Sequence, residues 1–331
     1  MFNNKSLLIT GGTGSFGRCF LKHILAHYPK IKKIVILSRD ELKQFELENS
    51  IDKKKINKLR FFIGDIRDRD RLKSAFNGID YVVHAAALKQ VPKAEYNPNE
   101  YIKTNIIGSQ NVIDAAIENK VKTVIALSTD KAAAPINLYG ATKLCADKLF
   151  SSANNVIGSN NIKFSVVRYG NVLGSRGSIL PFFLKQKNKS FFTITDKEMS
   201  RFNITLKEAC LMVEWAFKNC VGGEIFVPKI PSFKIIDLAK SIDPKKHLKI
   251  IGVRPGEKIH EEMITSSDSF NTVNLNKKYY VILNSSNEKL NNYYLIKKKL
   301  KKVKRGFSYN SGTNSKFLSI KEIKRLIKKI K

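Results

Sequence analysis

The chain has 331 residues, 43% of them hydrophobic and 27% charged, which is enough to bury a large core in one large or two unequal domains. No apolar run approaches the ~18 residues that a membrane-spanning helix needs, so we expect no membrane contact. The four cysteines are scattered and the five histidines show no metal-ligand spacing. We therefore expect reduced thiols in a cytoplasmic protein, and no metal site.

The formal net charge of +32 has two interpretations. A basic face could bind nucleic acid. Alternatively, the excess positive charge has no binding role and follows from an AT-rich genome, because most of it is Lys and it comes with abundant Asn and Ile. The lysines are dispersed, with local clusters at residues 53–55 and 297–299, and no aromatic-and-basic RNA motif or recognition helix stands out. We expect no nucleic-acid partner, and we note that a basic protein also attracts the pyrophosphate of a nucleotide sugar.

The chain opens with an apolar strand over residues 6–10, and a glycine-rich turn then leads into a helix. Glycines let the backbone approach a pyrophosphate, while the helix amino terminus supplies N–H groups and a positive dipole. A GxxGxxG turn between a strand and a helix therefore predicts a dinucleotide site. The predicted cofactor contacts in this turn are Gly11, Thr13, Gly14, Ser15, Phe16 and Gly17.

The end of the second strand, residues 33–37, indicates which dinucleotide binds. An acid there accepts from the ribose 2′-hydroxyl of NAD, whereas a cation accommodates the 2′-phosphate of NADP. The chain places Ser38, Arg39 and Asp40 at this point, with Lys43 one helical turn later. A hydroxyl with two cations favours NADP, while Asp40 leaves NAD as the less favoured alternative. Arg39 could also be an ordinary solvated loop residue.

Two further strand ends add to the predicted cofactor site. Asp65, followed by Ile66, could accept from the adenine amino group or could instead cap the next helix. The strand at residues 80–84 runs into Ala85 and Ala86, whose small side chains let the backbone lie against the cofactor.

Three polar residues near the fourth strand are predicted to have different roles. His84 lies at a buried strand end and is predicted to be structural. Lys89 can reach a phosphate or the substrate. Asn105 lies in the middle of a long helix that begins at Asn97 and Pro98, where its propensity is poor. We therefore expect Asn105 to hold a bulge, a water or a neighbouring carbonyl near the cofactor, and we assign Lys89 and Asn105 to the cofactor site.

The apolar run at residues 123–127 is predicted to be a buried parallel strand, and the residues after it carry the chemistry. Open α/β sheets place their active sites at the carboxyl ends of strands. Asp130 and Lys131 follow this strand, and Tyr139 and Lys143 lie i, i+4 on one face of the next helix. An ammonium beside a phenol favours the phenolate, so Lys143 should make Tyr139 a base. The ordinary alternative is a surface YxxxK pair.

The second half of the chain is less regular and is predicted to bind substrate. After a strand at residues 163–168 comes a glycine-rich loop, and short strands and helices alternate beyond it. Its polar residues include suitable donors for a uracil, a ribose and a pyrophosphate, although an exposed Arg is often just solvated. The predicted substrate contacts are Asn171, Thr195, Arg201 and Arg254, together with Lys89.

The order of elements predicts an α/β fold, with a Rossmann-like doubly wound parallel sheet and a smaller C-terminal α/β substrate domain. Residues 1–168 form the predicted NADP-binding domain. Residues 169–331 form mainly the substrate-binding domain, and the chain is expected to cross back to the first domain. Residues 264–318, which are polar and rich in Asn and Lys, are expected to wrap the substrate domain.

These motifs resemble those of the configuration-inverting UDP-N-acetylglucosamine 4,6-dehydratases, extended short-chain dehydrogenase/reductases that begin pseudaminic acid synthesis. The resemblance spans essentially the whole chain. The chain departs from the family pattern at Gln90, Asn203 and the pair Ala133 and Ala134. The resemblance rests on TGGTGSFG (10–17), SRDELKQ (38–44), HAAALKQVPKAEYNP (84–98), LSTDKAAAPINLYGATK (127–143), RYGNVLGSRGS (168–178), GGEIFVPKIPS (222–232), RPGEKIHEEM (254–263) and GFSYNSGTNS (306–315).

The resemblance implies a redox-neutral loss of water, with hydride taken from the sugar C4 and returned to C6 by NADP. Tyr139 would remove the proton of the 4-hydroxyl, and Thr129 would hydrogen-bond the 4-oxygen. Lys131 would remove the C5 proton, for which its pKa must be lowered. Asp130 would protonate the leaving 6-hydroxyl, for which its pKa must be raised. The family also implies a homo-oligomer, a dimer or higher and possibly a hexamer.

Two other classes of function compete with this interpretation. A UDP-hexose 4-epimerase or a C5-retaining dehydratase could use the same scaffold, but an epimerase would have no use for Asp130 and Lys131. A non-catalytic NADP-binding or nucleic-acid-binding protein would need no proton-transfer groups, and the nucleic-acid form should show salt-sensitive polynucleotide affinity.

Overall fold

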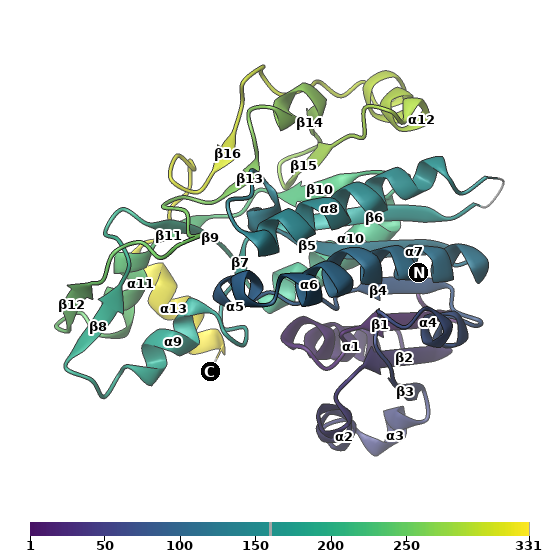
Figure 1. The fold of residues 1–331 in the computed structure, drawn as a ribbon, viewed down its shortest axis with the longest axis horizontal. Helices are drawn as coiled ribbons and strands as arrows, with labels where there is room; N and C mark the ends of the chain where they lie inside the picture. The colour runs from purple at the N-terminus through teal and green to yellow at the C-terminus, as the bar shows by residue number, and fades with distance from the viewer. Residues whose placement is uncertain (159–160, 331) are drawn as a thin grey trace.

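A nine-stranded sheet forms the centre of the computed structural model, which describes residues 1–158 and 161–330 (Figure 1). Its strands are β1 (Ser6–Thr10), β2 (Lys33–Ser38), β3 (Leu59–Ile63), β4 (Tyr81–His84), β5 (Thr123–Thr129), β6 (Lys163–Tyr169), β10 (Ile225–Pro228), β14 (Thr272–Asn274) and β15 (Tyr279–Ile282). They lie in the order β14-β15-β10-β6-β5-β4-β1-β2-β3. All neighbouring strands from β10 to β3 are parallel. β15 runs antiparallel to both of its neighbours, β10 and β14.

The central strands are nearly continuous apolar runs because helices cover both faces of the sheet. All five residues of β1 are buried, as are the first four residues of β5. The run β3-β2-β1-β4-β5-β6 is the strand order of a doubly wound dinucleotide-binding fold. The predicted α/β class and Rossmann-like parallel sheet are therefore confirmed.

Two groups of helices cover the sheet, one on each face (Figure 1). On one face, α1 (Ser15–His27) packs beside α10 (Leu206–Asn219) over a core that includes Phe20 and Phe226. On the other face, α7 (Gly108–Glu118) packs between α4 and α8 over Phe76 and Phe164. The outer and connecting helices are α2 (Glu41–Asn49), α3 (Lys53–Ile56), α4 (Arg69–Ala75), α5 (Val91–Tyr96), α6 (Pro98–Tyr101), α8 (Leu138–Ser152) and α12 (Glu288–Asn291).

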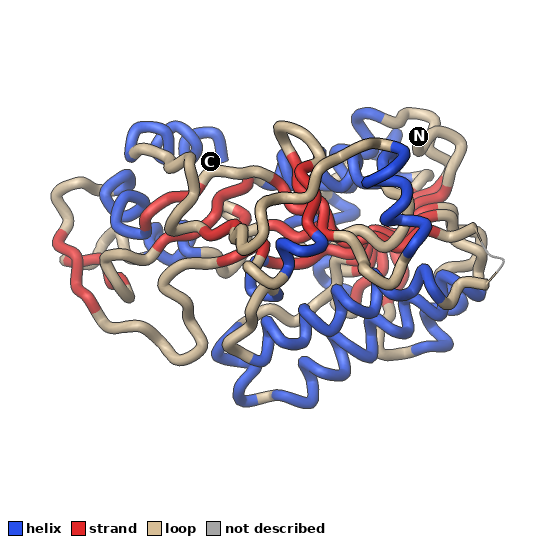
Figure 2. The backbone as a smooth tube through the Cα atoms, turned by 90° about the horizontal axis from the view of Figure 1, so that it is seen from above, coloured by secondary structure: helices blue, strands red, loops and turns tan. Residues whose placement is uncertain are grey.

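A second, smaller lobe lies beyond the carboxyl ends of the central strands (Figures 1 and 2). It has its own apolar core, which includes Phe183, Phe192 and Phe233. Its elements are β7 (Asn171–Val172), α9 (Ile179–Lys185), β8 (Phe191–Ile194), β9 (Ser200–Ile204), β11 (Ser232–Lys234), α11 (Ile235–Ile242), β12 (His247–Ile250) and α13 (Ile320–Ile330). The cleft between this lobe and the sheet contains the candidate site.

Residues 264–318 do not simply wrap the smaller lobe, contrary to expectation. β14 and β15 extend the main sheet beyond β10. Tyr294 then donates a 3.1 Å hydrogen bond to the fully buried Glu224, just before β10. A short pair of strands, β13 (Glu262–Ile264) and β16 (Tyr309–Asn310), joins this region to the smaller lobe. The strand pairings of this region could not be predicted from its polar composition, because short strands near the edge of a sheet bury few apolar side chains.

The long helix expected from Asn97 onward is interrupted. A π-helical turn, Ile102–Ile107, separates α6 from α7, and such turns widen a helix locally at functional sites. Asn105 lies within this turn. Within the described residues, no helix is long and apolar enough to cross a membrane.

A buried ion pair connects the sheet, α8 and the carboxyl-terminal region. Arg168 on β6 donates to Asp147 on α8 from Nε at 3.2 Å and from Nη2 at 3.0 Å. Its Nη1 also donates to the carbonyl of Met263 at 3.0 Å. Both charged side chains are at most 3% exposed. Removing one partner of such a pair leaves an uncompensated buried charge, which costs about 3–5 kcal/mol.

We predict that Arg168→Met lowers the thermal unfolding midpoint by many degrees, because Asp147 loses its buried counter-charge. Arg69→Met is the matched control, since Arg69 and Glu118 form an exposed pair of a kind that contributes at most about 1 kcal/mol. Circular dichroism melts of both variants test the difference. Equal midpoints for the two variants would show that the buried pair is not a major contributor to stability.

Candidate active site

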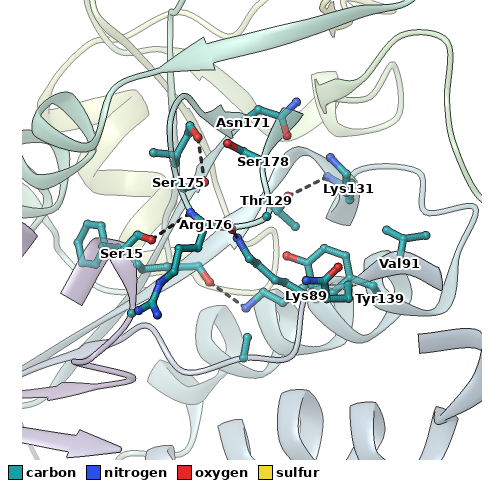
Figure 3. Close-up of a pocket in the computed structure, with 18 of the residues that line it drawn as sticks. Ser15, Lys89, Val91, Thr129, Lys131, Tyr139, Asn171, Ser175, Arg176 and Ser178 are labelled. Carbon is teal, nitrogen blue, oxygen red and sulfur yellow. Dashed lines mark hydrogen bonds between the residues drawn. The ribbon is translucent and has the colours of Figure 1, made fainter. Parts of the chain in front are cut away.

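A cavity of about 890 Å³ lies between the sheet and the smaller lobe, a size suited to a cofactor and a substrate. Figure 3 shows Ser15, Ser175 and Arg176 at one end of it and Thr129, Lys131 and Tyr139 at the other. Almost all the predicted site residues line it. These are Gly11, Thr13, Gly14, Ser15, Phe16, Gly17, Ser38, Arg39, Asp40, Lys43, Asp65, Ile66, Ala85, Ala86, Lys89, Thr129, Lys131, Tyr139, Lys143, Asn171, Thr195, Arg201 and Arg254.

Two predicted site residues are not part of the described cavity wall. Asp130 is fully buried behind Lys131. Asn105 is 1% exposed and holds the loop after β4, accepting from Leu88 N–H and donating to Leu88 C=O, both at 2.9 Å. It also donates to Thr142 Oγ1 at 3.0 Å. The expectation that Asn105 holds a neighbouring carbonyl is confirmed, whereas its assignment to the cofactor site is not supported, because Asn105 does not line the cavity.

The glycine-rich turn after β1 is shaped so that side chains cannot be added. A Cβ at Gly17 would lie 2.4 Å from the carbonyl oxygen of Gly12, and one at Gly11 would lie 2.9 Å from the backbone of Ala86. Gly11 also has a φ of +64°, which favours glycine. The first turn of α1 carries no side-chain cap among the described residues, so its N–H groups are available to an anion.

The region predicted to bind the ribose phosphate contains cations that already have counter-charges. Lys43 forms an ion pair with Asp40, and Asp40 also caps α2 by accepting from Lys43 N–H at 3.0 Å. Arg39 is 52% exposed and lies 3.6 Å from Asp65. A bound phosphate would therefore compete with two carboxylates.

Asp65 is not the cap of the following helix, because Asp68 caps α4 by accepting from Arg71 N–H at 2.9 Å. Asp65 instead accepts from Arg67, with 2.7 Å between Oδ2 and Nη2. Burial favours the neutral acid, but hydrogen bonds from Arg67 and the charge of Arg39 outweigh it and lower the pKa of Asp65. The carboxylate at this wall of the cavity is therefore charged.

The end of β5 holds a cluster of charged groups. Thr129 Oγ1 donates to Asp130 Oδ1 at 2.9 Å, and Lys131 Nζ donates to the same oxygen at 3.1 Å. Lys131 Nζ also lies 3.0 Å from Glu261 Oε1, a carboxylate on the segment just before β13. The site therefore contains one lysine between two carboxylates, where the sequence indicated only one.

The expected lowering of the Lys131 pKa is wrong. Burial alone would favour the neutral amine, but the charges of Asp130 and Glu261 outweigh it and raise the pKa of Lys131 above its usual value. The predicted direction for Asp130 agrees with the structure, since burial raises the pKa of this fully buried carboxyl. Because Asp130 and Lys131 lie 3.1 Å apart, the titration of one depends on the charge of the other.

Tyr139 and Lys143 lie on α8, which packs against the end of β5, so both lie beside this cluster. Burial raises the pKa of Tyr139 to about 12, although the nearby Lys131 charge opposes the shift. Lys143 donates to the carbonyl of Leu127 at 2.8 Å, and burial lowers the pKa of its ammonium. The expectation that Lys143 makes Tyr139 a phenolate is therefore contradicted in the protein alone, where Lys131 is the cation that favours the phenolate.

The sequence interpretation missed the role of the loop that contains Arg176. Arg176 Nη2 donates to Thr13 C=O at 2.8 Å, and its backbone N–H donates to Ser15 Oγ at 3.2 Å. Lys89 Nζ donates to the carbonyl of Arg176 at 3.0 Å. This loop closes over the glycine-rich turn (Figure 3). The motif RYGNVLGSRGS contained the signal, because an Arg between glycines can approach a pyrophosphate.

Most of the residues that were predicted to contact the substrate already have partners within the protein. Arg201 is 7% exposed and donates to the carbonyls of Ser200 and Ile259 at 2.7 and 3.0 Å. Arg254 forms an ion pair with Glu257, and Thr195 donates to Met199 Sδ at 3.0 Å. His84, as predicted, is structural, since its buried ring lies 2.9 Å from Thr10 Oγ1.

Buried polar atoms without a partner are concentrated at this cavity. Among the described residues, seven buried side-chain atoms lack a hydrogen bond, and five of them belong to residues that line the cavity: Thr104, Ser128, Ser178, Glu257 and Glu261. Buried polar groups are normally hydrogen-bonded, so this excess is expected of a site that a polar ligand completes. No cluster of metal-ligating side chains occurs in the part of the chain that the structure describes.

The chain is similar to known proteins over its whole length. Its sequence is 52% identical to the UDP-N-acetylglucosamine 4,6-dehydratase (inverting) of Campylobacter jejuni subsp. jejuni serotype O:23/36 (strain 81-176), over 99% of this chain and 98% of the relative. It is 40% identical to the UDP-glucose 4-epimerase of Rickettsia prowazekii (strain Madrid E), over 99% and 96% of the two chains.

A solved structure and a family model agree with these relatives. The X-ray structure of Pen from Bacillus thuringiensis superimposes with a TM-score of 0.88 at 39% identity and covers 99% of each chain. Residues 7–283 match the family model described as "Polysaccharide biosynthesis protein". The resemblance drawn from the motifs is therefore confirmed, and the chain belongs to the polysaccharide biosynthesis protein family.

Proposed function

We propose that this chain is a nicotinamide-dependent UDP-N-acetylglucosamine 4,6-dehydratase that inverts C5. The product would be UDP-2-acetamido-2,6-dideoxy-β-L-arabino-hex-4-ulose, formed in the first step of pseudaminic acid synthesis. The observation that carries this proposal is the Asp130–Lys131 pair at 3.1 Å, at the same end of the cavity as Tyr139. The 52% identity to an inverting dehydratase supports the choice of substrate.

Tyr139 is the residue suited to the first step, removal of the proton from the sugar 4-hydroxyl. Its phenol must ionise in a buried setting, and the Lys131 ammonium is the nearby charge that favours this. The raised pKa of Lys131 thus supports the first step. The nicotinamide, when bound, supplies the hydride acceptor at C4 and the hydride donor at C6.

Asp130 and Lys131 then serve the elimination of water. The chemistry needs a neutral amine to take the C5 proton and a neutral acid to protonate the leaving 6-hydroxyl. Transfer of one proton from Lys131 Nζ to Asp130 Oδ1, along their hydrogen bond, creates both groups at once. Full burial of Asp130 favours its neutral form and so supports this transfer. A new ketone at C4 acidifies the C5 hydrogen, so an amine is a sufficient base.

A 4-epimerase is the competing function, supported by the 40% identity to a UDP-glucose 4-epimerase. Such an enzyme could use Tyr139 and Lys143 but would have no use for a buried acid beside a lysine. A fully buried carboxyl with a raised pKa costs stability, which favours the dehydratase because that reaction uses the group.

We predict that Lys131→Ala retains the fold and cofactor binding but loses about 10²–10⁴-fold in turnover, as expected for a general base. The assay is incubation with UDP-N-acetylglucosamine in deuterated water. Loss of water with deuterium entering C5 would support the dehydratase, whereas epimerisation without C5 exchange would support the alternative. Lys148→Ala, an exposed change on α8, is the control. Turnover of Lys131→Ala at the wild-type rate would remove Lys131 from the mechanism.

We propose NADP as the cofactor, with NAD as the less favoured alternative. The glycine-rich turn and the uncapped α1 suit a pyrophosphate. Ser38, Arg39 and Lys43 line the cavity where a ribose 2′-phosphate would lie. Arg39 is the cation with the looser counter-charge contact, at 3.6 Å.

We predict that Arg39→Ala weakens NADP binding about 10- to 100-fold, the range expected from loss of a charge-assisted hydrogen bond. NAD affinity should change little, and it provides the internal control. Calorimetric titration of the wild type and the variant with both dinucleotides measures this. Tighter binding of NAD than NADP by the wild-type chain would contradict the proposed cofactor.

A further inference from the structure

Glu261 is a buried charged residue at the cavity that the chemistry above does not use. It is 2% exposed, and its Oε1 lies 3.0 Å from Lys131 Nζ and 3.8 Å from Arg201 Nε. Its other oxygen, Oε2, has no hydrogen-bond partner among the residues described. Because an incompletely paired buried carboxylate costs stability, this placement calls for a functional reason.

The backbone on both sides of this carboxylate is held by a distant segment. Glu261 N–H donates to Ser311 Oγ at 2.9 Å, and Ser311 N–H donates to the Glu261 carbonyl at 2.8 Å. Ser311 is fully buried and lies 2.8 Å from Ser200 Oγ. The pairing of β13 with β16 adds to this support. The motif GFSYNSGTNS near the carboxyl end therefore fixes where Glu261 lies.

We propose that Glu261 is the positioning residue for Lys131, holding the lysine nitrogen from the side opposite Asp130 so that it faces the sugar C5. This inference rests on the dehydratase function proposed above. The Lys131 nitrogen donates to Asp130 Oδ1 at 3.1 Å and lies 3.0 Å from Glu261 Oε1. When one proton moves to Asp130, the contact with Glu261 would hold the neutral amine in place. Its lone pair could then turn from Asp130 into the cavity.

The charge of Glu261 raises the pKa of Lys131, so this charge does not help the amine to form, and the contribution that we propose for Glu261 is orientation. The groups that face Lys131 are Asp130, Glu261, Arg201, Tyr139 and Lys89. Burial raises the pKa of Glu261, but the charges of Lys131 and Arg201 outweigh it and lower the pKa overall. Glu261 is therefore an anion at neutral pH. Its charge holds the proton on Lys131, so it opposes formation of the free amine while fixing the position of the nitrogen.

Orientation and charge can be separated with two substitutions. Glu261→Ala removes the carboxylate oxygen that contacts Lys131. Because misplacement of a base costs about 10²-fold in rate, we expect kcat to fall about 10²-fold. KM should change little. The primary isotope effect with substrate deuterated at C5 should rise, because C5 proton removal becomes rate-limiting. Glu261→Gln keeps an acceptor oxygen, so it should recover most of kcat. Because it removes a negative charge, it should move the acid limb of the pH profile to lower pH.

The neighbouring Glu262→Gln is the matched control, since Glu262 is partly buried on β13 and forms no ion pair with a residue that the structure describes. Wild-type kcat and isotope effect in Glu261→Ala would overturn the positioning role, as would a Glu261→Gln variant as slow as Glu261→Ala. If Glu261→Ala fails to fold, a Glu261→Gln variant that does not recover most of the wild-type kcat overturns it. Failure of the wild type and Glu262→Gln to dehydrate UDP-N-acetylglucosamine would instead overturn the proposed function.

Discussion

Charge balance among buried groups is the constraint on which this site depends. Asp130, Glu261, Lys131 and Arg201 form two acids and two cations within contact distances of 3.0–3.8 Å. In a poorly solvated setting, each charge needs its counter-charge, and removal of one leaves another uncompensated. Protons can therefore move between these groups, but the net charge of the cluster resists change. A reaction that transfers protons internally, without net uptake or release, suits such a cluster.

The fold brings the four groups together from three separate parts of the chain. β5 ends at the centre of the sheet, between β4 and β6, so its last residues open into the cleft. Arg201 comes from β9 in the smaller lobe, and Glu261 comes from the segment before β13. The β13–β16 pair and the buried Arg168–Asp147 pair hold that segment against the sheet. The site therefore depends on the two lobes being fixed relative to each other, and not on β5 alone.

The sequence alone predicted those parts of the molecule whose structure depends on residues that are close together in the chain. The buried strands are continuous apolar runs, the glycine turn is short, and the i, i+4 pair on α8 follows from helical geometry, so the parallel sheet and most cavity-lining residues could be predicted. The pKa of Lys131 could not, because its second counter-charge, Glu261, is distant in sequence. The Arg176 loop, the edge strand β14 and the pairing of β15 with the main sheet also depend on tertiary contacts, which composition does not reveal.

In the proposed mechanism, two neighbouring sets of residues serve the two steps. Tyr139 and Lys143 on α8 would serve oxidation at C4, and an epimerase could use the same pair. Asp130 and Lys131 after β5, with Glu261 before β13, would serve elimination across C5 and C6. Lys131 would connect the two steps: as an ammonium it favours ionisation of Tyr139, and as an amine it would accept the C5 proton. The raised pKa of Lys131 is therefore compatible with its role as a base, provided that its proton passes to Asp130 between the two steps.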